Sequence, residues 1–337
     1  MKILKDLNFL KNFIFSYFKH TAFFVRIIPT DKCNLNCSYC YQKSNHSLSM
    51  SWELFNQVFD KAVELKVGFM SFLGGEPMIW QHIYDAIALC SKKNITTDMT
   101  TNGTLLNEKT IEKLGKVGLD YLNVSVDTQD NYSVSKKNTL FDDDLVKTLK
   151  SAEKTYGMKL RMNGVIYNNN LKDVKLLLEL SKQKKIPLSL GFVVPDVKDV
   201  DDKEIYFSQQ DSDLLKEIVT YILNKKKEKY PVIDPNSYFN NVFKFLEQKS
   251  FWQCNYPTRF GWINVTASGA IRSCTKKMDE TTFEFISLTP EKIKLLKQTL
   301  AETVKECNPY CYSNCAYDSA YYKRNKLAFI KDKLSKF

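Results

Sequence analysis

The sequence predicts an α/β fold: a partial, TIM-like (β/α)6 barrel followed by a smaller, cysteine-rich α+β domain. Between residues 23 and 200, six short runs rich in β-branched and aromatic residues alternate with five amphipathic stretches, a pattern typical of parallel sheets with right-handed crossovers. Polar or cysteine-containing segments directly follow several of these runs, and parallel folds gather their sites at the carboxyl ends of strands. After residue 250 a hairpin and a group of cysteines replace the alternation.

The barrel elements are identified in order along the chain. The strands, which contain runs such as FFVRIIP and DYLNVSVD, are predicted at residues 23–29, 68–73, 95–100, 120–127, 159–167 and 187–194. The helices, identified by apolar residues at helical spacing, are predicted at residues 51–66, 80–92, 107–117, 142–156 and 171–184. The barrel domain is therefore expected to span residues 23–200.

Three further segments complete the chain. Residues 1–22 predict a basic amphipathic helix whose apolar face consists of Ile3, Leu7, Leu10, Ile14 and Phe18. Such a helix either caps the open base of the barrel or lies on a membrane surface. Residues 201–250 are charged and predict a helical linker. Residues 251–337 form the second domain, where RFGWINVTASGAIRSC predicts a β-hairpin that turns at ASGA.

The composition argues against several classes of protein. The chain has no run of eighteen or more apolar residues and no secretory cleavage pattern, so neither a spanning helix nor a signal peptide is expected. We therefore expect a cytoplasmic protein, in which nine cysteines are better suited to metal binding than to disulfides. The net charge of +11 comes mostly from scattered lysines. Because no arginine–aromatic cluster accompanies them, we expect no nucleic-acid partner.

Three cysteines follow the first predicted strand, at Cys33, Cys37 and Cys40. On a single loop they can all bind one metal centre. A structural zinc site needs four ligands, and the nearest histidine, His46, lies six residues beyond Cys40. An iron–sulfur cubane held by three cysteines leaves one iron open to a substrate or cofactor. The odd number of ligands therefore favours an iron–sulfur cluster.

The spacing Cys33-x3-Cys37-x-Tyr39-Cys40 resembles the signature of the radical S-adenosylmethionine (SAM) enzymes. The resemblance implies that these cysteines hold a [4Fe-4S] cluster whose open iron binds SAM. It implies an oxidoreductase or transferase that reductively cleaves SAM to a 5′-deoxyadenosyl radical, which abstracts hydrogen from a substrate. It also implies that Tyr39 packs near the adenine of SAM.

Further motifs follow the next strands in the order that this family shows. GGEP, residues 74–77, resembles the motif that engages the amino group of SAM. The cofactor-binding residues implied after strands two to four are Gly74, Gly75, Glu76, Asn102, Ser125 and Asp127. The expected adenine wall contains Asn163, Gly164, Val193 and Val194. Each motif alone is also consistent with an ordinary turn or helix entry, but their order after successive strands favours a common site.

A second group of cysteines in the last domain comprises Cys254, Cys274, Cys307, Cys311 and Cys315. It resembles the SPASM and twitch domains, which carry auxiliary [4Fe-4S] clusters, although a SPASM domain has more cysteines. We expect one twitch-like cluster, held by the first two of these residues and by two of the last three. A zinc site built from the same thiols is the alternative. Thr275 stands where peptide-oxidising relatives have an aspartate base, so the catalytic residue is unknown.

Two kinds of radical SAM reaction are consistent with the sequence. In the first, the enzyme takes hydrogen from a peptide or small molecule and receives electrons from a donor such as flavodoxin or ferredoxin. The 22 residues before the first strand leave no room for a leader-binding domain, so none is expected. In the second, the enzyme modifies a lipid or isoprenoid at a membrane surface, because residues 1–20 resemble the leading segment of hopanoid-modifying relatives. A protein of another class, a zinc-bearing adaptor, would not bind SAM.

Overall fold

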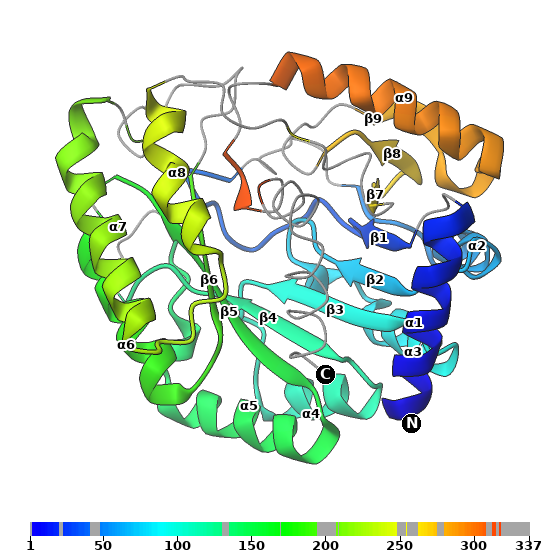
Figure 1. Ribbon diagram of the computed structural model, residues 1–337. Coiled ribbons are helices and arrows are strands. Elements are labelled where there is room, and N and C mark those ends of the chain that lie inside the picture. The colour runs from blue at the N-terminus through cyan, green and yellow to red at the C-terminus, as the bar shows by residue number, and fades with distance from the viewer. Residues whose placement is uncertain are drawn as a thin grey trace.

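A computed structural model of the protein describes residues 2–19, 23–40, 48–129, 135–168, 170–193, 207, 209–247, 254, 262–274, 280–307, 312–314 and 317. Its strands are β1 (Phe24–Ile27), β2 (Phe69–Phe72), β3 (Thr96–Thr101), β4 (Tyr121–Ser125), β5 (Lys159–Ile166), β6 (Leu188–Phe192), β7 (Trp262–Val265), β8 (Ala270–Arg272) and β9 (Glu280–Glu284). Its α-helices are α1 (Lys2–Lys19), α2 (Trp52–Glu64), α3 (Ile83–Lys92), α4 (Glu108–Lys116), α5 (Asp143–Tyr156), α6 (Leu171–Lys184), α7 (Ser212–Lys227), α8 (Asn236–Leu246) and α9 (Pro290–Cys307). The strands join in one sheet in the order β6-β5-β4-β3-β2-β1-β7-β8-β9 (Figure 1).

The predicted strands and helices of the barrel are confirmed, with ends that differ by at most three residues. Local signals explain several of the helix boundaries. Asn107 caps α4, because its side chain accepts a hydrogen bond from the Thr110 amide while Thr110 Oγ1 accepts one from the Asn107 amide. The α5 helix ends at Gly157, whose φ of 75° is a left-handed conformation that favours glycine.

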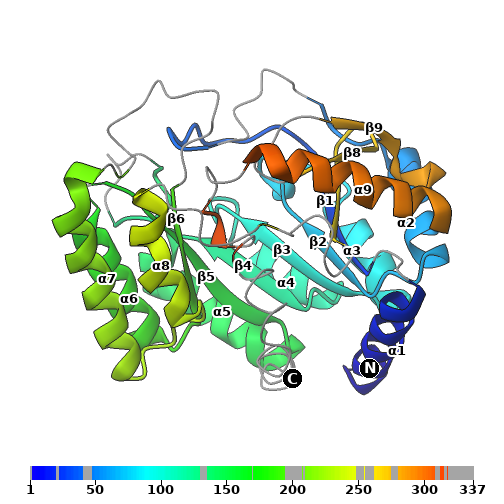
Figure 2. The same cartoon turned by 45° about the horizontal axis from the view of Figure 1, so that its top comes forward.

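The six barrel strands are all parallel, and each pairs with the next one along the chain. Figures 1 and 2 show α2 to α6 along the outer side of the curved sheet. The strand residues that face these helices are apolar and belong to the main hydrophobic core: Val25, Met70, Met99, Leu122, Leu160 and Leu190. Because successive side chains in a strand point to opposite faces, the intervening residues face the barrel interior.

The barrel interior is polar. Its side chains, read from the intervening strand positions, include Arg26, Ser71, Asp98, Asn123, Arg161, Asn163 and Ser189. Asn123 Nδ2 donates a hydrogen bond to Asp98 Oδ2 at 3.1 Å. Burial raises the pKa of the Asp98 carboxyl, against the lowering effect of Ser71 and of two arginines, Arg26 and Arg161. The inner face is therefore suited to polar rather than apolar contents.

The hairpin predicted after residue 260 is confirmed, since β7 and β8 pair antiparallel with Val265 opposite Ile271. The sequence did not predict its position. β7 pairs in parallel with β1, in register from Phe24 opposite Trp262 to Ile27 opposite Val265, so the hairpin extends the barrel sheet beyond its first strand. The predicted domain boundary near residue 251 stays a prediction.

The opposite edge of the sheet, at β6, is covered by residues 231–234 and by aromatic side chains. Asp234 accepts hydrogen bonds from the Leu190 amide at 2.7 Å and from Ser189 Oγ at 2.9 Å. Tyr238 of α8 stacks on Tyr312 with ring centroids 5.0 Å apart, and its hydroxyl accepts a hydrogen bond from the Phe192 amide. Tyr312 of the C-terminal region is therefore anchored beside β6, where its ring centroid also lies 6.3 Å from that of Phe192.

The predicted N-terminal helix is present as α1, but Leu7, Leu10 and Ile14 of its predicted apolar face are exposed. Lys5 is buried and forms a 2.8 Å ion pair with Asp120. Phe9 and Phe13 pack edge-on against Phe23, with ring centroids 4.9 and 5.3 Å apart. Thus α1 does lie against the barrel, but not through the apolar face that the sequence identified. Among the described residues, no helix is long and apolar enough to cross a membrane.

Candidate active site

The cysteine loop, residues 28–40, leaves the carboxyl end of β1 and is held by the GGEP segment. The Gly75 amide donates to Thr30 O at 3.0 Å, and the Glu76 amide donates to Lys32 O at 2.8 Å. A Cβ atom added at Gly75 would lie 2.1 Å from Lys32 O, a distance that only glycine avoids. Both glycines therefore allow close backbone contact between the end of β2 and the cysteine loop, and Gly74 has a φ of 138°.

Glu76 is fully buried and connects the ends of β2 and β3. Its Oε1 accepts hydrogen bonds from Thr101 Oγ1 at 2.7 Å and from the Met78 amide at 3.1 Å. Its Oε2 accepts one from the Asn102 amide at 2.7 Å. Burial raises the pKa of the Glu76 carboxyl, and these hydrogen bonds lower it by less. The predicted contact of Glu76 with SAM stays a prediction. The hydrogen bonds establish a structural role for Glu76, because they join the ends of β2 and β3.

Asn102 lies against the cysteine loop. Its Nδ2 donates to Asn34 Oδ1 at 2.8 Å and lies 3.8 Å from Cys33 Sγ. Asn34 Nδ2 in turn donates to Thr104 Oγ1 at 2.7 Å, and Thr104 Oγ1 donates to Asn102 Oδ1 at 2.6 Å. These three side chains form a closed ring that joins the cysteine loop to the segment after β3. The sequence analysis missed Asn34, although it lies directly after Cys33.

The three cysteines of the loop differ in exposure: Cys33 is exposed, Cys37 is buried and Cys40 is half-buried. The Cys40 amide donates to Cys37 O at 3.1 Å, which makes a tight turn between them. Burial raises the pKa of the Cys37 thiol to about 11; nearby Lys137 acts against this shift, and Cys40 and Cys33 add to it. Among the described residues, no cluster of three or more His, Cys, Asp or Glu side chains is arranged to hold a metal ion.

The donor set of this loop nevertheless fits an iron–sulfur cluster. The three thiols are free, lie on one short loop and influence each other electrostatically. Thiols bind metal as thiolates, so a protonated Cys37 must lose its proton when a metal binds. Cys33, Cys37 and Cys40 as metal ligands stay a prediction.

Tyr39, Asp127 and Lys137 form a buried polar group beside the cysteine loop. The Tyr39 hydroxyl donates to Asp127 Oδ2, and Lys137 Nζ donates to the Tyr39 hydroxyl at 3.0 Å. Lys137 also pairs with the fully buried Asp127 at 3.6 Å, whose Oδ1 accepts from the Val165 amide at 3.1 Å. Burial and then Asp127 raise the pKa of Tyr39 well above its ordinary value.

Lys137 was not identified from the sequence, because it lies ten residues after Asp127 in no motif. Burial lowers the pKa of its ammonium, but Asp127, Cys37 and Cys40 raise it, and the net shift is upward. Lys137 therefore supplies a buried positive charge beside two of the predicted cluster ligands.

A small apolar cluster borders this group at the carboxyl ends of β5 and β6. Tyr167 and Val193 are its buried members, and Tyr39 and Val165 pack against them. Tyr39 and Tyr167 have ring centroids 6.2 Å apart. Tyr39 and Val193, each predicted to lie near the adenine, thus belong to one cluster, and their contact with SAM stays a prediction. The sequence analysis missed Val165 and Tyr167.

The other residues predicted for the adenine wall have different surroundings. Gly164 lies where a Cβ atom would be 2.9 Å from Leu177 and 3.0 Å from Leu190, so it allows close packing on the helix side of the sheet. Ser125 ends β4 opposite Asn163 of β5 and is half-buried. Val194 lies outside the described residues.

The second group of cysteines is only partly described. Cys254 and Cys274 are half-buried and packed against the main core. Cys307 is the last residue of α9, while Cys311 and Cys315 lie outside the described residues. A shared cluster or zinc site therefore stays a prediction. Thr275 also lies outside the described residues.

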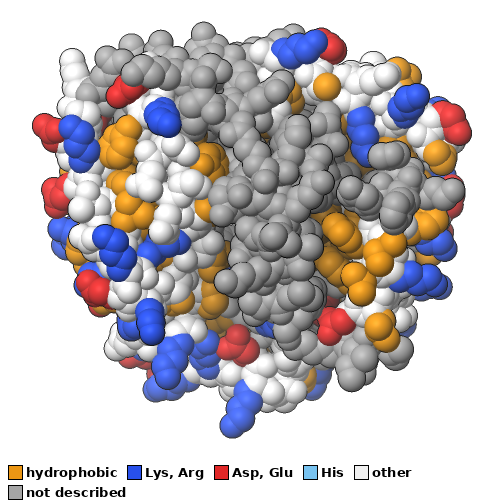
Figure 3. Space-filling model, in the orientation of Figure 1, with side chains coloured by type: hydrophobic (Ala, Val, Ile, Leu, Met, Phe, Trp, Pro, Cys, Tyr) orange, Lys and Arg blue, Asp and Glu red, His pale blue; other side chains and the backbone are white. Residues whose placement is uncertain are grey.

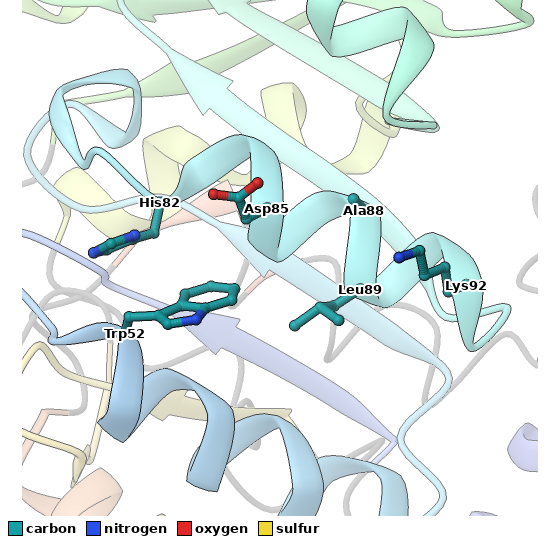
Figure 4. Close-up of a pocket in the computed structure, with 6 residues that line it drawn as sticks. All are labelled: Trp52, His82, Asp85, Ala88, Leu89 and Lys92. Atoms are coloured by element: carbon teal, nitrogen blue, oxygen red, sulfur yellow. The ribbon is translucent and has the colours of Figure 1, made fainter.

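A pocket of about 310 Å³ lies away from these residues, between α2 and α3 (Figure 4). Its lining consists of Trp52, His82, Asp85, Ala88, Leu89 and Lys92. The Trp52 and His82 rings stack with centroids 5.2 Å apart. None of the predicted site residues lines it, so it is not the predicted SAM site.

Comparison with known proteins identifies a family. Residues 27–195 match the Radical SAM superfamily. A GTP 3′,8-cyclase from Clostridium botulinum is 30% identical over 274 residues, which cover 74% of this chain and 80% of that protein.

Two solved structures share the fold. SuiB from Streptococcus suis, bound to its precursor peptide SuiA, superimposes with a TM-score of 0.65 at 16% identity, over 88% of this chain and 70% of that chain. The protein anSMEcpe, with bound AdoMet and the Kp18Cys peptide, gives a TM-score of 0.61 at 17% identity over 85% of both chains. At such identities the likeness establishes a common fold.

Proposed function

Since the chain belongs to the radical SAM superfamily, whose members are enzymes that bind a [4Fe-4S] cluster and SAM, we propose that Cys33, Cys37 and Cys40 hold this cluster. We further propose that the enzyme cleaves SAM reductively and abstracts hydrogen from a polar peptide or small molecule. The observation that carries the proposal is the convergence of Cys33, Asn102, Asp127 and Tyr39 at the carboxyl ends of the barrel strands.

When bound, the cluster supplies the electron that breaks a carbon–sulfur bond of SAM. The residues of this chain orient its ligands. Gly74 and Gly75 fix the cysteine loop by close backbone contact, and Asn34 with Asn102 fixes the position of Cys33. Lys137 offsets negative charge on the deprotonated thiols of Cys37 and Cys40.

The apolar cluster of Tyr39, Val165, Tyr167 and Val193 supports a site for the adenine of SAM. Aromatic and aliphatic side chains pack well on the faces of a flat ring. The polar edge of this cluster is the Asp127 carboxylate, held by Tyr39, Lys137 and the Val165 amide. Ser125, half-buried at the end of β4, is the residue that we assign to the remaining polar part of SAM.

The substrate class follows from the polar barrel interior. Arg26, Asp98, Asn123 and Arg161 line the inner face of the sheet. A hydrocarbon substrate could form no hydrogen bonds with these side chains, whereas a polar substrate could, and burying polar groups against hydrocarbon costs free energy. A polar substrate is therefore favoured over an isoprenoid. The names of similar proteins, a GTP cyclase and a peptide-bound SuiB, support a nucleotide-like or peptide substrate.

We also propose one auxiliary cluster, held by Cys254, Cys274 and two of Cys307, Cys311 and Cys315. Supporting it, Cys254 and Cys274 are both half-buried and pack against the main core, and Cys274 lies just after β8 of the hairpin. Tyr312, which is close in sequence to Cys311 and Cys315, is anchored against Tyr238 of α8. An electron donor such as flavodoxin or ferredoxin would reduce the clusters.

The test compares Cys37→Ala with Cys90→Ala. The second variant is the matched control, because it also removes one buried thiol. Cys90 is a residue of α3, and its fully buried thiol lies 3.5 Å from Met70 Sδ of β2, as expected of an inert structural thiol. After anaerobic reconstitution with iron and sulfide, the proteins receive SAM and dithionite, and 5′-deoxyadenosine is measured by chromatography. Loss of product in Cys37→Ala alone supports the proposal. Equal product in both variants would rule out Cys37 as a ligand.

A further inference from the structure

The proposed function gives no role to the exposed side of α1. The inner side of the helix is fixed by polar contacts: Lys5 Nζ lies 2.8 Å from Asp120 and 3.2 Å from Gly118 O, and Asn8 Nδ2 donates to Asn94 O at 2.9 Å. Phe9 and Phe13 pack on Phe23 from the same side. These contacts fix the rotation of the helix about its axis and direct its other side outward.

The outward side carries large apolar side chains. Leu7 is 59% exposed, Leu10 55%, Ile14 48% and Phe15 39%. Residues 7, 10 and 14 follow the spacing of a single helix face. Of the nine large hydrophobic side chains that are exposed in the described part of the chain, four lie on this helix. Figure 3, which has the orientation of Figure 1, shows hydrophobic side chains gathered over α1.

Exposed lysines lie on α1 and on two loops at the same end of the sheet, and α1 also carries Asp6. Lys11 is exposed and lies between Leu10 and Ile14 in the sequence. Lys66 and Lys93 are exposed on the loops that follow α2 and α3, and Lys93 adjoins Asn94, which binds α1. The chain as a whole has a net charge of +11. An apolar stripe flanked by lysines is complementary to an anionic lipid surface, which offers both hydrocarbon and negative charge.

The contacts of α1 define its position relative to the active site. Asn94, Gly118 and Asp120 precede β3 and β4, and Phe23 precedes β1. These are the amino ends of parallel strands, whereas Cys33, Asn102 and Asp127 follow the carboxyl ends. The two ends of a five-residue strand are about 17 Å apart, and β4 has five residues.

We propose that α1 docks the enzyme on an anionic membrane surface through Leu7, Leu10, Ile14 and Phe15, with the active site at the end of the barrel that faces away from the lipid. Such an enzyme takes its substrate from the aqueous side while it is held at the membrane. The proposal rests on the fold and not on the proposed reaction.

Vesicle binding by the full-length protein tests the docking. Vesicles of phosphatidylglycerol and phosphatidylcholine are compared with phosphatidylcholine alone by co-sedimentation, at low and high salt. We expect binding to the anionic vesicles that falls about tenfold or more in the variant Leu7→Ser/Leu10→Ser/Ile14→Ser. The matched control is Leu295→Ser, since Leu295 is 53% exposed on α9, and it should bind like the wild type. Lys11→Glu should weaken binding and reduce its salt dependence.

Three results would overturn the docking proposal. One is no binding of the wild type to anionic vesicles, and another is unchanged binding of the triple serine variant. The third is a wild-type dimer that the triple variant converts to monomer without any vesicle binding, because the stripe would then contact a second copy. Circular dichroism of each variant confirms that the fold is intact.

Hydrogen exchange tests the orientation. With vesicles present, amide exchange should slow in residues 5–15 and stay unchanged in residues 102–107, which follow β3 at the active-site end. Slower exchange in residues 102–107 would contradict the orientation. Production of 5′-deoxyadenosine should be equal in the triple serine variant and the wild type, so a failed docking test and a failed reaction remain distinguishable.

Discussion

Replacement of Glu76 distinguishes a structural connection from a direct contact with SAM. Glu76 is fully buried, and its carboxylate accepts hydrogen bonds from Thr101 Oγ1, the Asn102 amide and the Met78 amide. In Glu76→Ala the donors at Thr101 and Asn102 remain buried without an acceptor. Each such loss costs about 1–3 kcal/mol, so we expect a destabilisation of about 2–6 kcal/mol.

Glu76→Gln is the more informative variant. Its amide oxygen can accept from Asn102, but its amide nitrogen then faces the Met78 amide, which is also a donor. One hydrogen bond is lost and the shape is kept, so we expect a loss of about 1–3 kcal/mol. The control is Glu112→Gln, since Glu112 is half exposed and pairs with exposed Lys116. Exposed pairs of this kind contribute about 0–1 kcal/mol.

Urea unfolding of the metal-free protein, kept reduced and followed by fluorescence and circular dichroism, measures these changes. The comparison uses variants that unfold in one transition by both probes. We expect lower midpoints in both Glu76 variants at an unchanged slope. If Glu76→Gln unfolds at the wild-type midpoint but binds SAM more weakly, the structural account of Glu76 is wrong and the predicted contact with SAM is supported.

Three further changes test other parts of the site. Lys137→Met leaves the buried Asp127 without its cationic partner, and should destabilise the metal-free protein by about 3–5 kcal/mol in urea unfolding. The double variant Lys137→Met/Asp127→Asn should lose less stability than the sum of the losses in the two single variants. Gly75→Ala places a Cβ atom 2.1 Å from Lys32 O and should lower the iron content after reconstitution, whereas wild-type iron would contradict the contact. Burial raises the pKa of the Cys37 thiol to about 11, so its alkylation by iodoacetamide, followed by mass spectrometry, should still accelerate as the pH rises from about 9 to about 11. A rate that already levels off at pH ~9, as for an ordinary thiol, would contradict this shift.

The barrel could be predicted because its signals are local. Each strand is a short run of β-branched or aromatic residues, and each helix shows apolar residues at helical spacing or a cap such as Asn107. The cysteines and the GGEP segment stand at the carboxyl ends of these strands, where parallel sheets place their sites. The region of the candidate site could therefore be predicted from the order of the elements and from the motifs that follow the strands.

The remaining features depend on contacts between distant residues. The parallel pairing of β7 with β1 joins residues more than 230 positions apart, and no short pattern encodes it. The orientation of α1 is decided by the ion pair of Lys5 with Asp120 and by Phe9 and Phe13 on Phe23. Its amphipathic pattern identified the helix but not which side would contact the barrel. Lys137 reaches Asp127 and Tyr39 from a segment without any motif.

The central claim is that Cys33, Cys37 and Cys40 hold a cluster separate from one held by the C-terminal cysteines. The most direct test is the iron and sulfide content of the anaerobically reconstituted wild type and of Cys33→Ala/Cys37→Ala/Cys40→Ala. We predict about eight irons per wild-type chain and about four in the triple variant, because a cubane contains four. Equal iron content in the two proteins would contradict a cluster on this loop.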